Sequence, residues 1–549
     1  MNKKTVLRRS ICAALAAAFA LSAGTTAFAE TPPRAGDVLR DTQQTERKLP
    51  ERKAPNVTVE EKVKPPLAVD QSLKVFVKSY RITGQDVIPE EQLTGLLTGY
   101  VNKELNFTAL QQARDTITKH LQKKGYFVAQ AYLPQQDVNE GAVEITVLIG
   151  RYGNMTIKNQ TRVSDAAVRA QLRSLKPGAY IHTAQMERAA LLASDLMGVT
   201  VKATLAPGKN PGTADVIVEV TPKGKDLQGM LSFDNYGSRL TGYNKGTLHL
   251  SYNNPFRSGD KLSGTFSETN NAQNTGDLTY QIPIAEGSSL TLRYAKVKYE
   301  FTLDGSAYSG TAYTKHADWT YALKRSRAAN LYAQVGYDHK TMTDLGPQND
   351  SALSRMVSFG LSGDSSDELW GGGANAYSLT YYSGSLSSET PPSGSWSKYT
   401  YSYLRQQTLN DRLSLMLSLS GQASSDNLDG SERFSLGGPY GVRAYPVSEG
   451  SGYKGYLTTA ELRYTVPAAQ KGALWQFSAF YDRGVSTEKN YEGTDDRHTV
   501  SGIGLGVQYA KPGDYALKVT YAQRIGNRQP KADEQFGSSR LWLQAVKYF

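Results

Sequence analysis

The sequence predicts two α+β modules in tandem, followed by an all-β transmembrane barrel of about 16 antiparallel strands. Two observations carry this prediction. The order strand, helix, helix, strand, strand occurs twice before residue 224, and from residue 225 onward apolar and polar residues alternate without a convincing helical pattern. A chain of 549 residues also exceeds one ordinary core, which favours several domains.

Residues 1–29 have the pattern of a secretory signal peptide. Basic residues are followed by an apolar run over residues 11–21 and by the small-residue sequence Ala-Phe-Ala at 27–29. Cys12, the single cysteine, lies in this segment. We therefore expect a mature chain without disulfides and without cysteine-bound metal.

The formal net charge of +11 is mild for a chain of this length. Four of the positive charges and no acidic residue lie in the predicted signal peptide, which leaves about +7 for the mature chain. No long run of Lys or Arg indicates a nucleic-acid partner. After the signal peptide no stretch of eighteen apolar residues predicts a transmembrane helix, whereas a barrel would carry its lipid-facing residues in alternation.

Residues 30–66 are polar and rich in proline. Residues 34–49 could form one short helix that carries Val38 and Leu39, which is too little apolar surface to bury alone. Residues 50–66 read as an extended linker. Simple disorder of the whole segment is the alternative.

The first module is predicted over residues 67–150 and the second over 151–224. The expected strands are 73–84, 126–133 and 143–149 in the first module, and 154–158, 199–205 and 214–221 in the second. The expected helices are one that begins at Pro89, then 107–124, 164–175, and one from Thr183 to near Gly198. Each module leaves an edge strand that could accept an extended chain, unless neighbouring segments cover it.

The barrel is predicted over residues 225–549. About twenty residues per strand and connection give the expected strand number. A soluble β-sandwich would show similar alternation, but hardly as one unbroken run of this length. The chain ends at Phe549 within a final strand, as bacterial barrels commonly do.

Residues 437–446 differ from an ordinary polar turn. They are dense in glycine and place one cation, Arg443, among aromatic residues. If residues 475–482 form a strand, Phe480 and Asp482 share one face. Asp482 could then hold Arg443 in a charge-assisted pair in a wet lumen, worth roughly 1 to 3 kcal/mol. The alternative is an ordinary loop arginine and an ordinary strand-end aspartate.

No catalytic site is predicted. The six histidines show no pair at metal-ligand spacing, and no serine elbow, phosphate loop or nucleotide fingerprint stands out. We expect no enzyme activity, no cofactor and no metal.

Several motifs resemble those of the two-partner secretion transporters, which export haemolysins and filamentous haemagglutinins and belong to the superfamily of barrel-assembly insertases. Residues 35–40 resemble the start of that family's plug helix, 132–136 its first periplasmic polypeptide-transport-associated (POTRA) module, and 198–215 its second. The first barrel strand of the family is similar to residues 233–239, which include Asp234, Asn235, Tyr236 and Gly237.

Two further motifs match in order and spacing. Gly441, Val442, Arg443 and Tyr445 match the inward-folded loop motif, in which Ala444 replaces the usual glycine. The strand motif that meets this loop is matched by Phe480, Asp482 and Gly484.

The resemblance implies an outer-membrane translocator with POTRA modules in the periplasm. It would bind an unfolded partner exoprotein, an adhesin or haemolysin with β-repeats, and export it through the barrel. Further implied partners are outer-membrane lipid and the barrel-assembly machinery, with Phe549 as the assembly signal. An insertase of the same superfamily is the alternative. A barrel protease lacks clustered acids with a histidine, and a passive porin would not need the modules.

Overall fold

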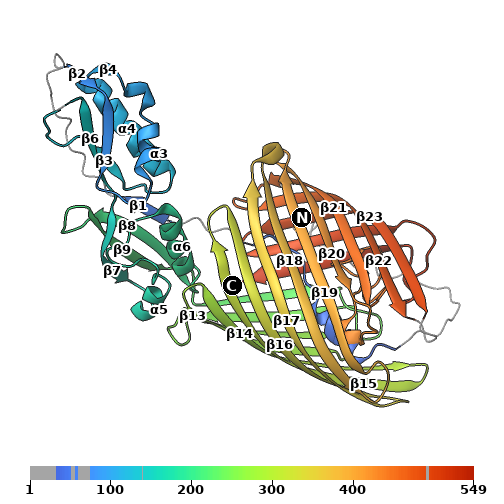
Figure 1. Ribbon diagram of the computed structural model, residues 1–549. Helices are drawn as coiled ribbons and strands as arrows, with labels where there is room; N and C mark the ends of the chain where they lie inside the picture. The colour runs from blue at the N-terminus through green and yellow to red at the C-terminus, as the bar shows by residue number, and fades with distance from the viewer. Residues whose placement is uncertain (1–31, 51–55, 60–73, 139, 490–493) are drawn as a thin grey trace, which may run out of the picture.

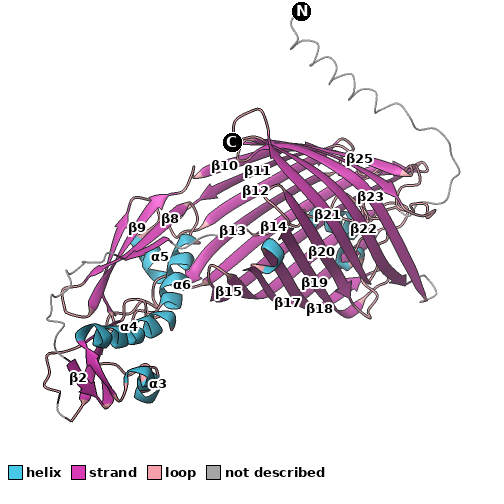
Figure 2. Ribbon diagram, turned by 90° about the horizontal axis from the view of Figure 1, so that it is seen from above, coloured by secondary structure: helices cyan, strands magenta, loops and turns pink. Residues whose placement is uncertain are grey.

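The computed structural model describes residues 32–50, 56–59, 74–138, 140–489 and 494–549. It consists of a closed barrel of sixteen strands with two α/β modules at one end (Figure 1). The longest helices lie in those modules, while strands alone close the barrel wall (Figure 2). The predicted fold class is confirmed. The predicted signal peptide lies outside the described residues.

The first module has a three-stranded sheet in the order β3-β6-β5 and a separate pair, β2-β4. Its elements are β2 (Lys74–Val77), β3 (Ser79–Thr83), α3 (Glu90–Gly95), η1 (Thr98–Tyr100), β4 (Lys103–Asn106), α4 (Phe107–Lys123), β5 (Gln130–Tyr132) and β6 (Ala142–Leu148). The side chain of Asn106 caps α4 by accepting from the backbone N of Ala109 at 2.9 Å. One face of α4 packs on the sheet because its apolar residues recur at helical spacing: Leu110, Ala113, Ile117 and Leu121.

One predicted strand of this module is divided in the structure. In place of the predicted strand 73–84 the structure has two strands, β2 and β3, because the chain turns at Lys78 after pairing with β4. The charged sequence of β4 gave no alternation signal, so this strand was not predicted.

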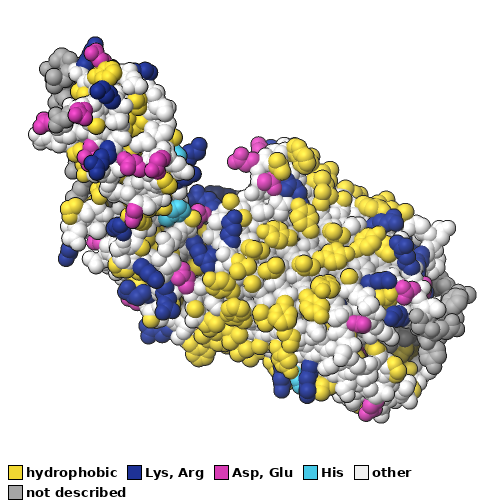
Figure 3. Space-filling view, viewed as in Figure 1, with side chains coloured by type: hydrophobic (Ala, Val, Ile, Leu, Met, Phe, Trp, Pro, Cys, Tyr) yellow, Lys and Arg dark blue, Asp and Glu magenta, His cyan; other side chains and the backbone are white. Residues whose placement is uncertain are grey.

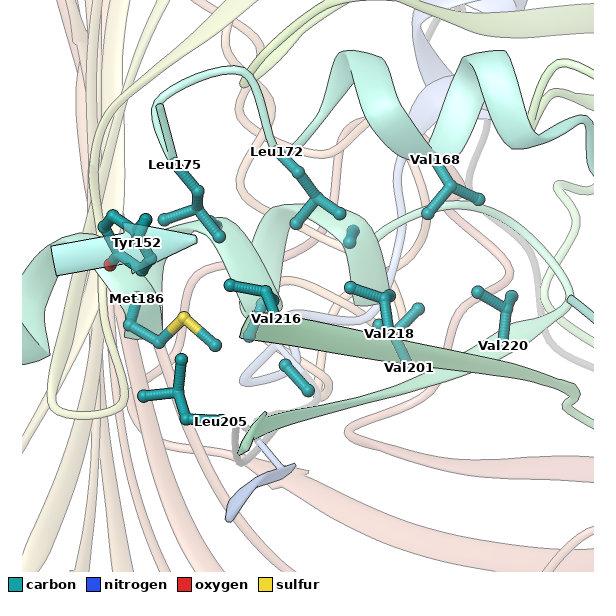
Figure 4. Close-up of a cluster of buried hydrophobic side chains, with 14 of the residues drawn as sticks. Tyr152, Val168, Leu172, Leu175, Met186, Val201, Leu205, Val216, Val218 and Val220 are labelled. Carbon is teal, nitrogen blue, oxygen red and sulfur yellow. The ribbon is translucent and has the colours of Figure 1, made fainter. Parts of the chain in front are cut away.

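The second module contains β7 (Arg151–Asn159), α5 (Asp165–Ala170), α6 (Thr183–Ser194), β8 (Val199–Pro207) and β9 (Thr213–Pro222). Side chains of α6 and of the sheet meet in one apolar core that includes Tyr152, Met186 and Val218 (Figure 4). The predicted helix 164–175 ends earlier, at Ala170, since the following turns bury Leu172 and Leu175 in that core.

The linker covers one edge of this module's sheet. Strand β1 (Asn56–Val59) pairs in parallel with β8 and gives the sheet order β1-β8-β9-β7. Val57 packs against the module's core, and the hydroxyls of Thr58 and Thr204 lie 2.9 Å apart. The alternative considered for the sequence, that neighbouring segments cover an edge, therefore holds for β8.

The barrel strands run antiparallel in chain order, and β25 pairs with β10 to close the wall. They are β10 (Leu227–Asp234), β11 (Lys245–Asn253), β12 (Lys261–Thr269), β13 (Asn274–Ala285), β14 (Ser288–Leu303), β15 (Ser306–Arg325), β16 (Ala329–Leu345), β17 (Asp350–Asp367), β18 (Gly373–Ser388), β19 (Gly394–Thr408), β20 (Leu413–Ala423), β21 (Lys454–Pro467), β22 (Leu474–Lys489), β23 (Asp495–Lys511), β24 (Tyr515–Arg524) and β25 (Ser539–Tyr548).

The outer wall carries the apolar half of the alternation. Leu248, Phe266, Leu361 and Leu505 are among its exposed apolar residues. Figure 3 shows hydrophobic side chains spread over the middle of the barrel, with charged side chains toward its two ends. This is the surface that a lipid bilayer requires.

The second module is fastened to one rim of the barrel. Arg325 at the end of β15 donates two hydrogen bonds to Asp195, at 2.7 and 2.9 Å. Arg188 of α6 donates to the backbone oxygen of Ala322 at 2.6 Å. These contacts hold the module beside one opening of the barrel.

The N-terminal segment lies inside the barrel. Helix α2 (Ala35–Gln43) contacts β14, β15 and β16, and the chain then continues without regular structure to Pro50. Glu46 accepts from Lys518 of β24 at 2.9 Å. Pro50 lines a cavity of about 700 Å³ at the rim that the second module occupies. The segment thus follows the lumen from the far end to the opening beside the second module.

Candidate functional site: the inward loop of the barrel

The loop between β20 and β21 turns back into the lumen. The backbone N of Val442 donates to the oxygen of Leu436 at 2.7 Å, and that of Gly438 donates to Tyr445 at 3.1 Å. A Cβ on Gly441 would lie 2.1 Å from the oxygen of Leu436, so this tight turn needs glycine. The side chains of Val442 and Tyr445 are fully buried.

The turn places Arg443 against Asp482 of β22. Its Nε donates to Oδ2 and its Nη2 to Oδ1, both at 2.9 Å, and its backbone N donates to Oδ2 at 3.2 Å. The planar guanidinium matches the two carboxylate oxygens, which a lysine could not do. The two residues proposed as partners are therefore in direct contact.

This pair is more buried than expected. The side chain of Asp482 is 0% exposed and that of Arg443 is 12% exposed. The wet lumen assumed for the sequence is wrong at this point, because the loop itself excludes water from the wall. Breaking such a pair costs more than breaking a surface pair.

Arg443 has a second carboxylate partner that the sequence did not indicate. Its Nη1 donates to Glu461 of β21 at 2.6 Å, and Arg463 donates to the other oxygen of Glu461 at 2.7 Å. Thr459 donates to Asp482 at 2.9 Å. Only the pairing of Thr459 with Asp482 across β21 and β22 brings these groups together.

The wall motif shapes the surface beneath the loop. The guanidinium carbon of Arg443 lies 3.2 Å from the centre of the Phe480 ring. A Cβ on Gly484 would lie 2.9 Å from Leu436 and 3.2 Å from Val442, so a larger residue would push the loop away. Phe480 and Gly484 thus support the loop rather than contact solvent.

Ala444, which replaces the usual glycine of the motif, packs against a glycine of the wall. A Cβ on Gly502 of β23 would lie 2.5 Å from the Cβ of Ala444. Glycine at 502 therefore leaves room for the extra methyl group, and Ala444 is fully buried.

The first-strand motif joins the same cluster. The ring of Tyr236 makes edge contacts with Tyr440 and Trp542, with centroids 5.6 and 5.8 Å apart. Trp542 donates its indole N–H to the backbone oxygen of Arg443 at 2.7 Å. The strand that closes the barrel therefore touches the loop directly, a contact that the sequence did not indicate.

The other residues of that motif stabilise the seam between β10 and β25. The side chain of Asn235 donates to Leu541 at 2.9 Å and accepts from Leu543 at 2.8 Å. The carboxylate of Asp234 accepts from the backbone N of Tyr236 at 3.0 Å. A Cβ on Gly237 would lie 1.9 Å from the oxygen of Gly242, so the turn after β10 needs glycine.

Phe549 lies apart from the loop, at the end of the seam near the second module. Its backbone N and O exchange hydrogen bonds with Gly229 at 3.0 and 2.9 Å, and its ring lies over that glycine. The side chain remains 55% exposed.

The loop also holds α2. Arg40 donates to the backbone oxygen of Gly430 at 3.1 Å, to Ser451 at 2.9 Å and to Ser448 at 3.0 Å. Ser448 in turn donates to Asp41. The helix and the loop therefore share one polar contact surface.

A buried charge cluster fixes the first part of the loop to the inner wall at β16 and β19. Glu432 accepts from Lys340 of β16 at 2.5 Å and lies 2.8 Å from Lys398 of β19. All three side chains are less than a tenth exposed. One carboxylate thus pairs with two neighbouring cations.

Within the described ranges, no group of three or more His, Cys, Asp and Glu side chains could hold a metal ion. Nor does any helix in those ranges have the length and apolar content of a bilayer span.

Comparison with known proteins identifies the family. The profile of the family described as haemolysin secretion/activation protein ShlB/FhaC/HecB matches residues 212–509. The chain belongs to this family. A profile for the ShlB-type POTRA domain matches residues 75–150. The chain is therefore an outer-membrane translocator of two-partner secretion, with POTRA modules on the periplasmic side.

Individual relatives match over most of their length. The heme/hemopexin transporter protein HuxB of Haemophilus influenzae (strain 86-028NP) is 24% identical over 98% of both chains. The outer membrane transporter CdiB of Dickeya dadantii (strain 3937) is 25% identical over 82% of both. Among solved structures, CdiB from Escherichia coli superposes with a TM-score of 0.73 at 19% identity, covering 89% of this chain and 93% of that one.

Proposed function

We propose that this translocator binds its partner exoprotein through the two periplasmic modules and passes it through the barrel lumen. The cavity at the periplasmic mouth carries this proposal. It is lined both by module residues, including Leu192 and Leu196, and by inner-wall residues such as Tyr332 and Gln334. A chain held by the second module would thus already lie at the opening.

Residues 32–50 lie in the lumen, so the same proposal requires this segment to move. We assign residues 30–66 as plug and linker, 67–150 and 151–224 as the two POTRA modules, and 225–549 as the translocating barrel. The helix is held by polar contacts around Arg40, which water can replace when the helix leaves.

We further propose that Arg443 and Asp482 form a functional pair. Their bond holds the loop between α2 and the wall, so its loss would misplace the surface on which α2 rests. We assign Phe549 to recognition by the barrel-assembly machinery during insertion, because more than half of this residue is exposed at the periplasmic end. The outer wall contacts outer-membrane lipid.

For the partner, we propose a large secreted β-repeat protein of the adhesin or haemolysin type, and no enzyme activity in the translocator. The name of HuxB mentions heme/hemopexin, whereas the name of CdiB mentions no transported species, so we propose the class of the partner and not its identity. An extended segment of the partner would add to a free sheet edge of a module.

The test is export with cross-linking. Cells that produce the translocator and its partner are assayed for partner in the medium, and photo-cross-linkers are placed between residues 164 and 221 while export is stalled. Cross-links from the second module to the partner are expected. Cross-links confined to the barrel would show that the modules are only spacers, and absence of export would contradict the proposed route.

A further inference from the structure

Much of the inner wall of the barrel is polar, but the part beneath α2 carries an apolar patch. We define the lumen patch as six residues of β14, β15, β16, β18 and β19: Val297, Tyr299, Ala312, Met342, Leu386 and Trp396. All belong to one buried apolar cluster and are between 1% and 6% exposed. Apolar residues on an inner wall require an apolar occupant, because water in the lumen would otherwise cover them.

Three side chains of the lumen patch lie in a continuous row along the wall, and its aromatic rings lie over glycines. Val297 pairs with Ala312 across β14 and β15, and Ala312 pairs with Met342 across β15 and β16, so these three side chains form one row. A Cβ on Gly310 would lie 2.4 Å from the Tyr299 ring, and one on Gly384 would lie 2.7 Å from the Trp396 ring. Glycine at both positions lets the rings lie against the wall and leaves the lumen open.

A polypeptide already occupies this surface. Ala35, Val38 and Leu39 of α2 belong to the same apolar cluster, and α2 contacts the three strands that form the row. Polar contacts also hold the helix. The backbone N of Ala35, for example, donates to Asp344 at 2.8 Å. Departure of α2 would therefore leave an apolar surface facing the lumen.

The patch lies at the end of the lumen away from the second module. Leu386 is seven residues before Ser393 in the turn between β18 and β19, and Ser393 donates to its backbone oxygen at 3.1 Å. Arg34, just before α2, contacts Asp350 and Thr390 at the same end. A chain that leaves the barrel passes this part of the wall last.

We propose that the lumen patch, once α2 has left, binds apolar segments of the exported partner at the exit end of the lumen. The inference rests on the proposed lumen route. An unfolded chain presents apolar side chains that the folded protein would bury, and these cover the patch in place of Val38 and Leu39. Each captured segment resists backward slippage while the chain ahead of it folds outside.

The test distinguishes binding of the exported partner by the lumen patch from a role of the patch only in holding α2. Val297→Thr with Met342→Gln makes the row polar at similar volume. The pair is introduced into the full chain and into a chain lacking residues 34–49. Met416→Gln, on β20 away from the patch, is the matched control. Partner in the medium is measured at equal amounts of heat-resistant barrel.

The polar pair is expected to lower export at least threefold in both backgrounds, while Met416→Gln leaves it unchanged. Normal export by the polar pair in the chain without α2 would overturn the inference, because the patch would then serve only the helix. If neither the full chain nor the chain lacking residues 34–49 exports the partner without the substitutions, the lumen route itself fails. That result is distinct from failure of the patch.

A second measurement applies if removal of α2 alone abolishes export. A photo-cross-linking residue at Met342 or Leu386 in the full chain is expected to capture α2 at rest and the partner when export is stalled. Capture of the stalled partner from Met416 but from neither patch position would overturn the inference.

Discussion

Removal of Arg443 is the sharpest perturbation of the lumen. In Arg443→Ala, Asp482 stays buried but loses two side-chain donors and keeps Thr459. Breaking a buried pair by removing one partner costs about 3 to 5 kcal/mol. We expect the lower end of this range, because Glu461, the second partner of Arg443, still pairs with Arg463 and keeps a counter-charge. About 3 kcal/mol shifts the loop roughly a hundredfold toward other positions.

We therefore expect Arg443→Ala to assemble as a heat-resistant barrel that exports its partner poorly. Arg443→Lys should rescue export only in part, because lysine lacks the planar fork that meets both oxygens of Asp482. Asp482→Ala should resemble Arg443→Ala, and the double variant should be little worse than either, since both remove one interaction.

The assay is partner protein in the medium for these four variants and the parent at matched barrel levels. Arg463→Ala is a useful control, since it removes a neighbouring cation that does not touch Asp482. Additive losses in the double variant, or normal export by Arg443→Ala, would refute the reasoning.

Three further outcomes follow from the same contacts. Deleting residues 34–49 should raise single-channel conductance in planar bilayers, and unchanged conductance would contradict a plug. Glu432→Gln should lower the temperature at which the folded barrel unfolds in detergent gels, since two buried lysines lose their counter-charge at a cost of about 3 to 5 kcal/mol. The more exposed Glu488→Gln should cost under about 1 kcal/mol. Equal effects of the two substitutions would argue against a stabilising role of the buried cluster. Asp195→Ala should broaden spin-label distances between module and barrel, and an unchanged distribution would mean that Arg325 does not fix the module.

Local patterns were sufficient for the architecture. Alternation over the last 325 or so residues predicted a transmembrane barrel because each strand has one lipid-facing and one lumen-facing side. The spacing of Leu110, Ala113, Ile117 and Leu121 predicted α4 because helical packing repeats every three to four residues. The loop and wall motifs also indicated which arginine and which aspartate to compare.

The contacts of the site depended on tertiary structure. Glu461 reaches Arg443 only through the register of β21 with β22, and Trp542 only because the last strand closes on the first. The burial of Asp482 depends on the loop that covers it. Such neighbours are distant in the chain and obey no period. The sequence by itself therefore determined the two modules and the barrel, whereas long-range strand register and loop packing decided which side chains meet and how dry their surroundings are.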